Sequence, residues 1–214
     1  MLKVIRFIFN HFEENTYLVI DSATNDCAII DPGMLNANEQ NALDREIADS
    51  GAKLTQIILT HAHLDHCFGA EYVHNRYGAP VKAHKEDEFL AKKLFDQACR
   101  FGLGGIVASG LEFDVTLEEG DIIYIGQSTL KVIHVPGHSP GGIVLYSEDD
   151  KVAFVGDSIF KGSIGRTDLD GGNHATLINS LRKKILTLPE DTVLLSGHGD
   201  PTTVKNERDT NPFL

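Results

Sequence analysis

The stretch Thr60-His61-Ala62-His63-Leu64-Asp65-His66 carries three histidines and one aspartate within seven positions. Its first residue, Thr60, ends the run 56–60, which is apolar and β-branched and predicts a buried strand. A strand end that opens into a loop is where α/β folds place ligands. In an extended chain His61 and His63 point to the same side, because side chains alternate with a period of two. A helix that starts just after them would turn the Asp65-His66 pair toward a second point, so the stretch predicts ligands for two metal sites.

Two ligands for each ion do not complete a metal site, because a catalytic site needs about three protein ligands and an open position. The missing ligands are expected downstream, in glycine-led turns that end three further predicted strands. These turns carry His138, Asp157 and His198. Glycine permits sharp turns and a close approach of the backbone. Each residue alone would be an ordinary surface or core residue, and the shared context makes the three candidate ligands.

Other polar residues are open to more than one interpretation. Asp31, which precedes Pro32-Gly33 at a predicted strand end, fits a turn former and equally a residue that orients a metal-bound histidine. Cys67 is expected to be a buried helix residue, with a redox-sensitive neighbour of His66 as the alternative. The remaining histidines are expected to be ordinary surface or core residues, namely His11, His74, His84, His134 and His174.

Hydrophobic patterning predicts the same order of elements in both halves of the chain. The first half has predicted strands at 4–9, 16–21, 27–31, 56–60 and 80–83, and helices at 38–50, 69–77 and 86–100. The second half has predicted strands at 122–125, 130–135, 143–146, 152–155 and 193–195, and a helix at 176–186. Strands followed by helices in each half indicate an α/β fold of two facing sheets with helices outside, a four-layer αββα sandwich.

Composition bounds the class of protein. The 214 residues are 42% hydrophobic and show no linker, so residues 1–214 are expected to form a single domain. The net charge of -12 argues against a nucleic-acid partner, whose phosphates require a basic face. Three scattered cysteines fit a reducing compartment. Because neither a membrane-spanning run nor a signal peptide is evident, we expect a cytoplasmic protein without a membrane partner; its oligomeric state stays open.

These residues together resemble the metallo-β-lactamase superfamily over nearly the whole chain. The resemblance rests on the Asp31 strand end, 60–66, and the motifs Gly137-His138-Ser139-Pro140-Gly141, Gly156-Asp157-Ser158 and Gly197-His198-Gly199. Within that superfamily the chain is most similar to the short glyoxalase II-like (hydroxyacylglutathione hydrolase-like) enzymes, because of 160–168 and the Asn211-Pro212-Phe213-Leu214 terminus.

The resemblance implies two divalent metal ions, with zinc expected first and iron or manganese as alternatives. The first ion would be held by His61, His63 and His138, and the second by Asp65, His66 and His198. Asp157 would bridge both. The implied reaction is hydrolysis of a small-molecule thioester such as S-lactoylglutathione by a hydroxide that the two ions share, with Asp65 as ligand and candidate proton acceptor.

The same resemblance concerns the substrate. Arg166 falls where these enzymes place a basic residue for the carboxylate of the thiol, with a surface ion pair as the alternative role. The predicted helix at 86–100 and the glycine-rich 102–110 are expected to cap the cleft. Three departures from the glyoxalase II pattern concern glutathione. The C-terminal helical domain of glyoxalase II is expected to be absent, because few residues follow His198. In addition, Asp168 and Asp200 replace aromatic contacts, and Phe68 replaces a glycine.

Three alternatives stay open at this stage. A persulfide dioxygenase resembles the same fold, shares the stretch 165–168, and holds one iron, here with His61, His138 and Asp157. A lactone or β-lactam hydrolase is the second alternative, because fold alone does not fix the substrate. A non-catalytic metal-binding module is the third, and it explains the open coordination positions less well. The number of metal ions per chain distinguishes hydrolase from dioxygenase.

Overall fold

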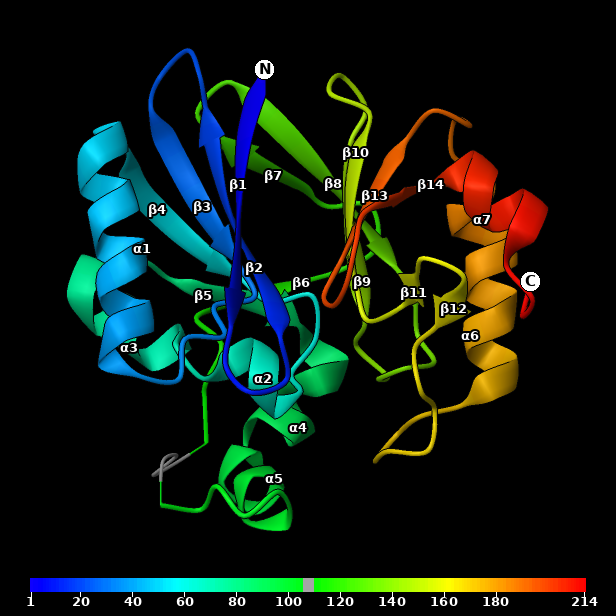
Figure 1. Cartoon of the computed structure of the whole chain (residues 1–214), viewed down its shortest axis with the longest axis horizontal. Helices are drawn as coiled ribbons and strands as arrows, with labels where there is room; N and C mark the ends of the chain where they lie inside the picture. Colours follow the sequence, from blue (N-terminus) through cyan, green and yellow to red (C-terminus); the bar gives the residue numbers. More distant parts are fainter. Residues whose placement is uncertain (106–109) are drawn as a thin grey trace.

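The protein consists of two six-stranded sheets that face each other, with helices covering their outer sides (Figure 1). The computed structural model describes residues 1–105 and 110–214. The buried side chains form three hydrophobic clusters, one between the sheets and one between each sheet and its helices. Three apolar layers between four structural layers are what an αββα sandwich requires, so the predicted fold class is confirmed.

The first sheet has the order β1-β2-β3-β4-β5-β6, antiparallel from β1 to β3 and parallel from β3 to β6. Its strands are β1 (Leu2–Phe9), β2 (Glu14–Asp21), β3 (Asp26–Ile30), β4 (Lys53–Ile58), β5 (Val81–His84) and β6 (Val115–Leu117). Alternation along β2 sends Leu18 and Ile20 toward the helices and Tyr17 and Val19 toward the other sheet. Both faces of this sheet are therefore buried.

The second sheet has the order β14-β13-β10-β9-β8-β7, and only β10 and β13 run parallel to each other. Its strands are β7 (Ile122–Ile125), β8 (Ser128–His134), β9 (Ile143–Ser147), β10 (Val152–Gly156), β13 (Val193–Ser196) and β14 (Thr202–Thr203). A small hairpin of β11 (Ile159–Phe160) and β12 (Ser163–Ile164) follows β10. The short strands β6, β11, β12 and β14 were not predicted, because two or three residues carry no periodicity.

Helices flank each sheet as expected. On the first sheet lie α1 (Ala37–Ser50), the single turn α2 (Leu64–Cys67) and α3 (Ala70–Tyr77). On the second lie α6 (His174–Ser180), which continues as a π-helical segment (Leu181–Ile185), and α7 (Val204–Thr210). The α1 helix begins where Asn36 accepts hydrogen bonds from the N–H groups of Asn38 and Glu39, and it ends at Gly51 with a φ of 63°. The helix α7 was not predicted.

The single helix predicted over 86–100 is wrong, because the structure divides it. A 3₁₀ turn (Lys85–Asp87) leads into α4 (Glu88–Ala91), and α5 (Leu94–Arg100) starts after a break at Lys92 and Lys93. At the break, the Leu90 carbonyl accepts from the N–H of Lys93 and from Nε2 of Gln97, and the Ala91 carbonyl accepts from the N–H of Leu111. Phe89, in α4, is 36% exposed.

This topology brings several strand ends to one edge of the sandwich. The chain leaves β3, β4, β8, β10 and β13 there, and the turn between β1 and β2 lies at the same edge (Figure 1). Within the described residues, every helix is too short or too polar to cross a membrane.

Candidate metal centre

Three buried histidines from two loops form the first group of candidate ligands. His61 and His63 follow β4, and His138 follows β8. One nitrogen from each ring lies within 4.8 Å of the others, and Nδ1 of His63 is 2.8 Å from Nε2 of His138. Three imidazole nitrogens this close together can all coordinate one ion, so the three rings fit a site for a single cation.

A second group lies beside the first and is more open. Asp65 and His66 belong to α2, while His198 comes from the turn after β13. Oδ2 of Asp65 lies 3.2 Å from Nε2 of His198 and 3.7 Å from Nε2 of His66. The His66 ring is fully buried, whereas the Asp65 and His198 side chains are 19% and 26% exposed. This second site therefore faces solvent on one side.

Asp157, at the end of β10, lies between the two groups. Its Oδ1 is 3.4 Å from Nε2 of His66, and its Oδ2 is 3.6 Å from Nε2 of His198. The same Oδ2 is 3.7 Å from Nε2 of His138, which belongs to the first group. One carboxylate therefore faces both groups, and all seven residues predicted as ligands come together at this edge.

The histidine rings are held by partners on their outer nitrogens. Nδ1 of His138 lies 2.7 Å from the carbonyl oxygen of Arg166, and Nδ1 of His198 lies 2.9 Å from that of Phe12. A carbonyl can only accept, so each Nδ1 carries a proton, and each Nε2 faces the centre as the candidate ligand atom. Such outer hydrogen bonds fix the orientation of metal-ligating imidazoles.

The hydrogen bonding of the atoms at the middle of the centre shows whether these residues suit a metal. Among the described residues, the buried atoms Nε2 of His61, Nε2 of His66 and Oδ1 of Asp157 have no hydrogen-bond partner. Polar atoms that are buried without a partner cost free energy unless a ligand satisfies them. Imidazole and carboxylate donors suit zinc, iron or manganese. The donor set and its unpaired atoms therefore fit divalent metal ions.

The electrostatics of the centre favour uncharged rings for His61 and His63. Burial lowers the pKa of His61 well below its ordinary value, and burial together with His138 lowers the pKa of His63 to about 3. In the second group burial also opposes the charge of His66, but the carboxylates of Asp157 and Asp65 outweigh it and raise the pKa of His66. Two carboxylates thus give the second group a strong attraction for positive charge.

Asp31 supports the centre from behind. Its Oδ1 accepts a hydrogen bond from the N–H of Thr60 at 2.7 Å, and its Oδ2 lies 3.1 Å from Nδ1 of His66. Asp31 also has a φ of 51°, which is the left-handed conformation typical of tight turns. Both interpretations of this residue, turn former and partner of a histidine, therefore describe contacts that it makes.

Sequence reasoning missed two buried carboxylates next to the centre. Asp87 accepts hydrogen bonds from the N–H groups of Ala62 and Gly141 and from the hydroxyl of Ser139, which are neighbours of the first histidine group. Glu14 is fully buried with Oε1 4.0 Å from Nδ1 of His66, and burial raises its pKa. Both residues lie in segments with ordinary polar patterns, so no local signal identifies them.

The surroundings of Cys67, His84 and His134 indicate structural roles. Cys67 is buried in α2, as expected, and burial raises the pKa of its thiol. His84 and His134 meet near Glu86, but their rings stack face to face with centroids 4.1 Å apart and planes 14° apart. Parallel stacked rings cannot both direct a nitrogen lone pair at one ion. Nε2 of His134 also lies 2.8 Å from the carbonyl of Pro140, so the pair supports the loop of His138.

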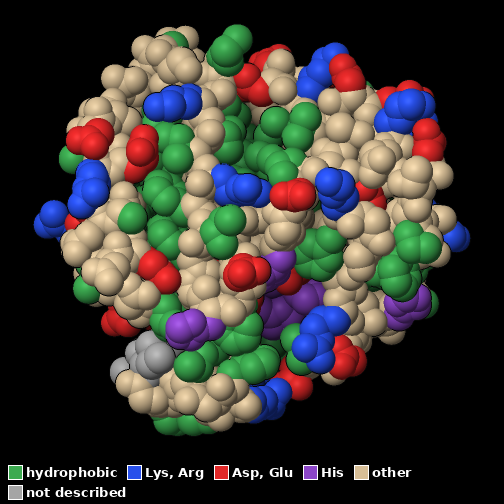
Figure 2. Space-filling view, viewed as in Figure 1, with side chains coloured by type: hydrophobic (Ala, Val, Ile, Leu, Met, Phe, Trp, Pro, Cys, Tyr) green, Lys and Arg blue, Asp and Glu red, His purple; other side chains and the backbone are tan. Residues whose placement is uncertain are grey.

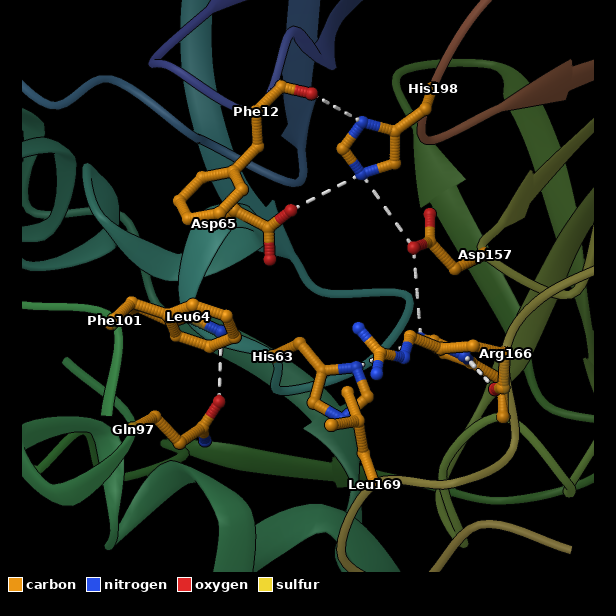
Figure 3. Close-up of a pocket in the computed structure, with 11 residues that line it drawn as sticks. Phe12, His63, Leu64, Asp65, Gln97, Phe101, Asp157, Arg166, Leu169 and His198 are labelled. Atoms are coloured by element: carbon orange, nitrogen blue, oxygen red, sulfur yellow. Dashed lines mark hydrogen bonds and ion pairs between the residues drawn. The ribbon is translucent and has the colours of Figure 1, made fainter.

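A pocket of about 220 Å³ opens directly onto the centre, and both ligand groups reach its wall. The view in Figure 2 shows histidine side chains at the surface, next to hydrophobic side chains and a Lys or Arg. Arg166 lines the pocket, and the structure also places Phe101, which follows α5, in its wall (Figure 3). Gln97, which belongs to the predicted cap 86–100, also lines the pocket, whereas Phe101 lies just after that segment. Part of the other predicted cap, 106–109, lies outside the described residues.

The fold and this centre define a family. Residues 10–198 match the model of the metallo-beta-lactamase superfamily, and the chain belongs to that superfamily, as the sequence predicted. It is 39% identical over 204 residues to the hydroxyacylglutathione hydrolase GloC of Haemophilus influenzae, covering 95% of this chain and 93% of that one. The similarity agrees with the predicted glyoxalase II-like branch and places the chain among metal-dependent hydrolases.

Solved structures give the same family. BLEG-1, a B3 metallo-β-lactamase, is 35% identical with a TM-score of 0.88, covering 100% of this chain and 99% of that one. A di-iron-bound form of TTHA1623 is also 35% identical, with a TM-score of 0.87, covering 99% and 100%. ETHE1 from Myxococcus xanthus is 25% identical with a TM-score of 0.78, covering 99% and 83%.

Proposed function

We propose that this protein is a dinuclear metal-dependent hydrolase that cleaves a small-molecule thioester such as S-lactoylglutathione. The observation that carries the proposal is the pair of ligand groups, three residues each, on either side of Asp157 at the wall of an open pocket. The similarity to a hydroxyacylglutathione hydrolase along 95% of the chain supports the thioester as substrate class.

The residues of the chain have distinct parts in this proposal. His61, His63 and His138 would hold one ion, Asp65, His66 and His198 the other, and Asp157 would contact both. A pair of divalent ions at such a site polarises a carbonyl group and lowers the pKa of water. Asp65, which is part-exposed at the pocket, would accept a proton during hydrolysis. The buried histidines His61, His63 and His138 would hold and orient the first ion.

The direct test combines metal analysis with an assay. Purified protein loaded with zinc, iron or manganese should bind two ions per chain and hydrolyse S-lactoylglutathione. His198→Ala should reduce the content to one ion per chain, because it removes a ligand of the second group only. Hydrolysis no faster than that of the metal-free protein, with every one of these metals loaded, would refute the thioester proposal.

A second candidate function is that of a persulfide dioxygenase with one iron. The similarity to ETHE1 favours it, and His61, His138 and Asp157, the ligands that this function implies, lie together. It leaves Asp65, His66 and His198 without a role, although these side chains converge at 3.2 to 3.7 Å. One iron per chain and oxygen consumption with glutathione persulfide would establish it in place of the hydrolase. The likeness to BLEG-1 makes β-lactams a useful third substrate in the same assays.

A further inference from the structure

The pocket has an apolar wall facing the polar centre. Phe12, from the turn between β1 and β2, contacts Phe101 edge to face, with ring centroids 5.5 Å apart. The two rings remain 36% and 48% exposed, and Leu64 and Leu169 line the pocket with them. In Figure 3 both phenylalanines lie on the side away from Arg166. Exposed aromatic rings beside a reactive centre offer a surface for an apolar group of a substrate.

The apolar wall continues into a smaller hollow of about 50 Å³. Phe101, Leu169 and His63 line both spaces, and Leu90 is added in the smaller one. Gln97 also borders both, but its amide is used by the protein. Nε2 of Gln97 donates to Ala62 and Leu90 carbonyls, and its Oε1 accepts from the N–H of Leu64. This side of the cleft therefore offers contact area more than hydrogen bonds.

The cations around the same cleft are already paired with carboxylates of the chain. Arg166 donates from Nε and Nη2 to both oxygens of Asp168, at 2.7 and 2.8 Å. This two-point contact is the strongest arrangement that a guanidinium forms with a carboxylate. Arg100, in the smaller hollow, contacts Asp170 at 3.2 Å. A carboxylate group of a substrate would have to compete with Asp168 and Asp170 for these cations.

We infer that the cleft selects thioesters with an apolar group, packed against the wall formed by Phe12 and Phe101, and an uncharged thiol part, in preference to thioesters of anionic thiols. This inference rests on the proposed hydrolase function and names its substrate class. The apolar group gains by leaving water for an aromatic wall. An anionic thiol part finds cations that Asp168 and Asp170 already neutralise, within a chain of net charge -12.

A binding experiment with thioethers tests the inference without needing hydrolysis. Titration calorimetry on the metal-loaded protein would compare S-benzyl-N-acetylcysteamine with S-methyl-N-acetylcysteamine and with S-benzylglutathione. We expect the neutral benzyl compound to bind about tenfold or more tightly than either of the others, which is the usual effect of a filled hydrophobic subsite. Equal or tighter binding of S-benzylglutathione would overturn the inference.

Two substitutions with matched controls locate the effect. Phe101→Ala should remove most of the advantage of benzyl over methyl, whereas Phe95→Ala should keep it. Phe95 lies in α5 and is 44% exposed, but it is not part of the pocket wall. Equal losses in both variants would contradict a subsite at Phe101.

Asp168→Asn should release Arg166 and improve binding of S-benzylglutathione relative to the neutral compound by about tenfold, which is the order expected for a charge-assisted hydrogen bond. Asp191→Asn removes a similar exposed partner, that of Lys151, and should change neither affinity. An unchanged ratio of the two affinities in Asp168→Asn would show that the ion pair with Asp168 does not keep Arg166 from binding an anionic ligand.

Hydrolysis assays with thioesters, run in parallel with the binding experiments, separate the two proposals. If the binding preferences hold but no thioester is hydrolysed, the proposed function fails while the apolar subsite stands. If S-lactoylglutathione is hydrolysed with a higher kcat/KM than the phenylacetyl thioester of N-acetylcysteamine, the function stands and the inferred preference fails.

Discussion

The buried carboxylate of Asp87 accepts a hydrogen bond from the backbone N–H of Ala62 at 2.9 Å. Ala62 lies between His61 and His63, so this contact fixes the loop that carries both. The same carboxylate accepts hydrogen bonds from the hydroxyl of Ser139 at 2.8 Å and the N–H of Gly141 at 2.6 Å, in the loop of His138. One side chain therefore sets the spacing between the two loops that form the first ligand group.

Substitution of Asp87 should weaken metal binding without removing any ligand. Asp87→Asn leaves one acceptor oxygen where the loops need two, and each buried donor left unsatisfied costs about 1–3 kcal/mol. We expect metal affinity to fall by about 10–100-fold, as for other partners that orient ligands. Chelator titration followed by metal analysis measures this. Asp96→Asn, at an exposed position of α5, is the control. Wild-type affinity in Asp87→Asn would contradict the argument.

Asp31 should affect the second ligand group in the same way. Asp31→Asn keeps a side chain that tolerates the left-handed φ of 51°, but it removes the charge that faces Nδ1 of His66 at 3.1 Å. We expect metal content to fall, with metal affinity at the second ligand group about 10–100-fold weaker. Asp21→Asn is a matched control, because Asp21 is also a buried strand-end aspartate, hydrogen-bonded to Gln127. It should lower stability and leave metal content unchanged; loss of metal in both variants would indicate a general effect.

Gly197 keeps the centre open. A Cβ at this position would lie 2.3 Å from Oδ1 of Asp157 and 2.5 Å from Cε1 of His66. Gly197→Ala should therefore displace both side chains and reduce metal content and activity at least about tenfold while the sandwich still folds. Gly105→Ala is the control, since a Cβ there meets nothing within 4 Å in the described part of the chain. Circular dichroism checks the fold, and full metal content in Gly197→Ala would disprove the crowding.

The candidate ligands could be predicted from the sequence for a topological reason. His138, Asp157 and His198 each follow a strand, and strands of the two sheets deliver their ends to one edge. A local pattern therefore carried three-dimensional information. Asp87 and Phe101 carry no such pattern, because their roles come from contacts with Ala62 and Phe12, far away in the sequence. The break before α5 involves a similar contact, since the Ala91 carbonyl accepts from the N–H of Leu111, which lies well beyond the end of α5.

The stacked pair of His84 and His134 should make stability depend on pH. His84 is only 4% exposed, and burial, together with the nearby His134, lowers its pKa below the ordinary 6.5. As pH falls below 6.5 the unfolded chain therefore takes up a proton at His84 before the folded protein does. By linkage this removes stability toward acid, by at most about 1.4 kcal/mol per pH unit for one proton.

His84→Phe keeps a flat ring for the stack and cannot ionise. Urea unfolding at pH 7.5, 6.5 and 5.5 should thus show a smaller loss of stability toward acid in this variant than in the wild type. His174→Phe, at an exposed position of α6, should keep the wild-type slope; a His84→Phe slope equal to that of His174→Phe would show that His84 is not the group responsible.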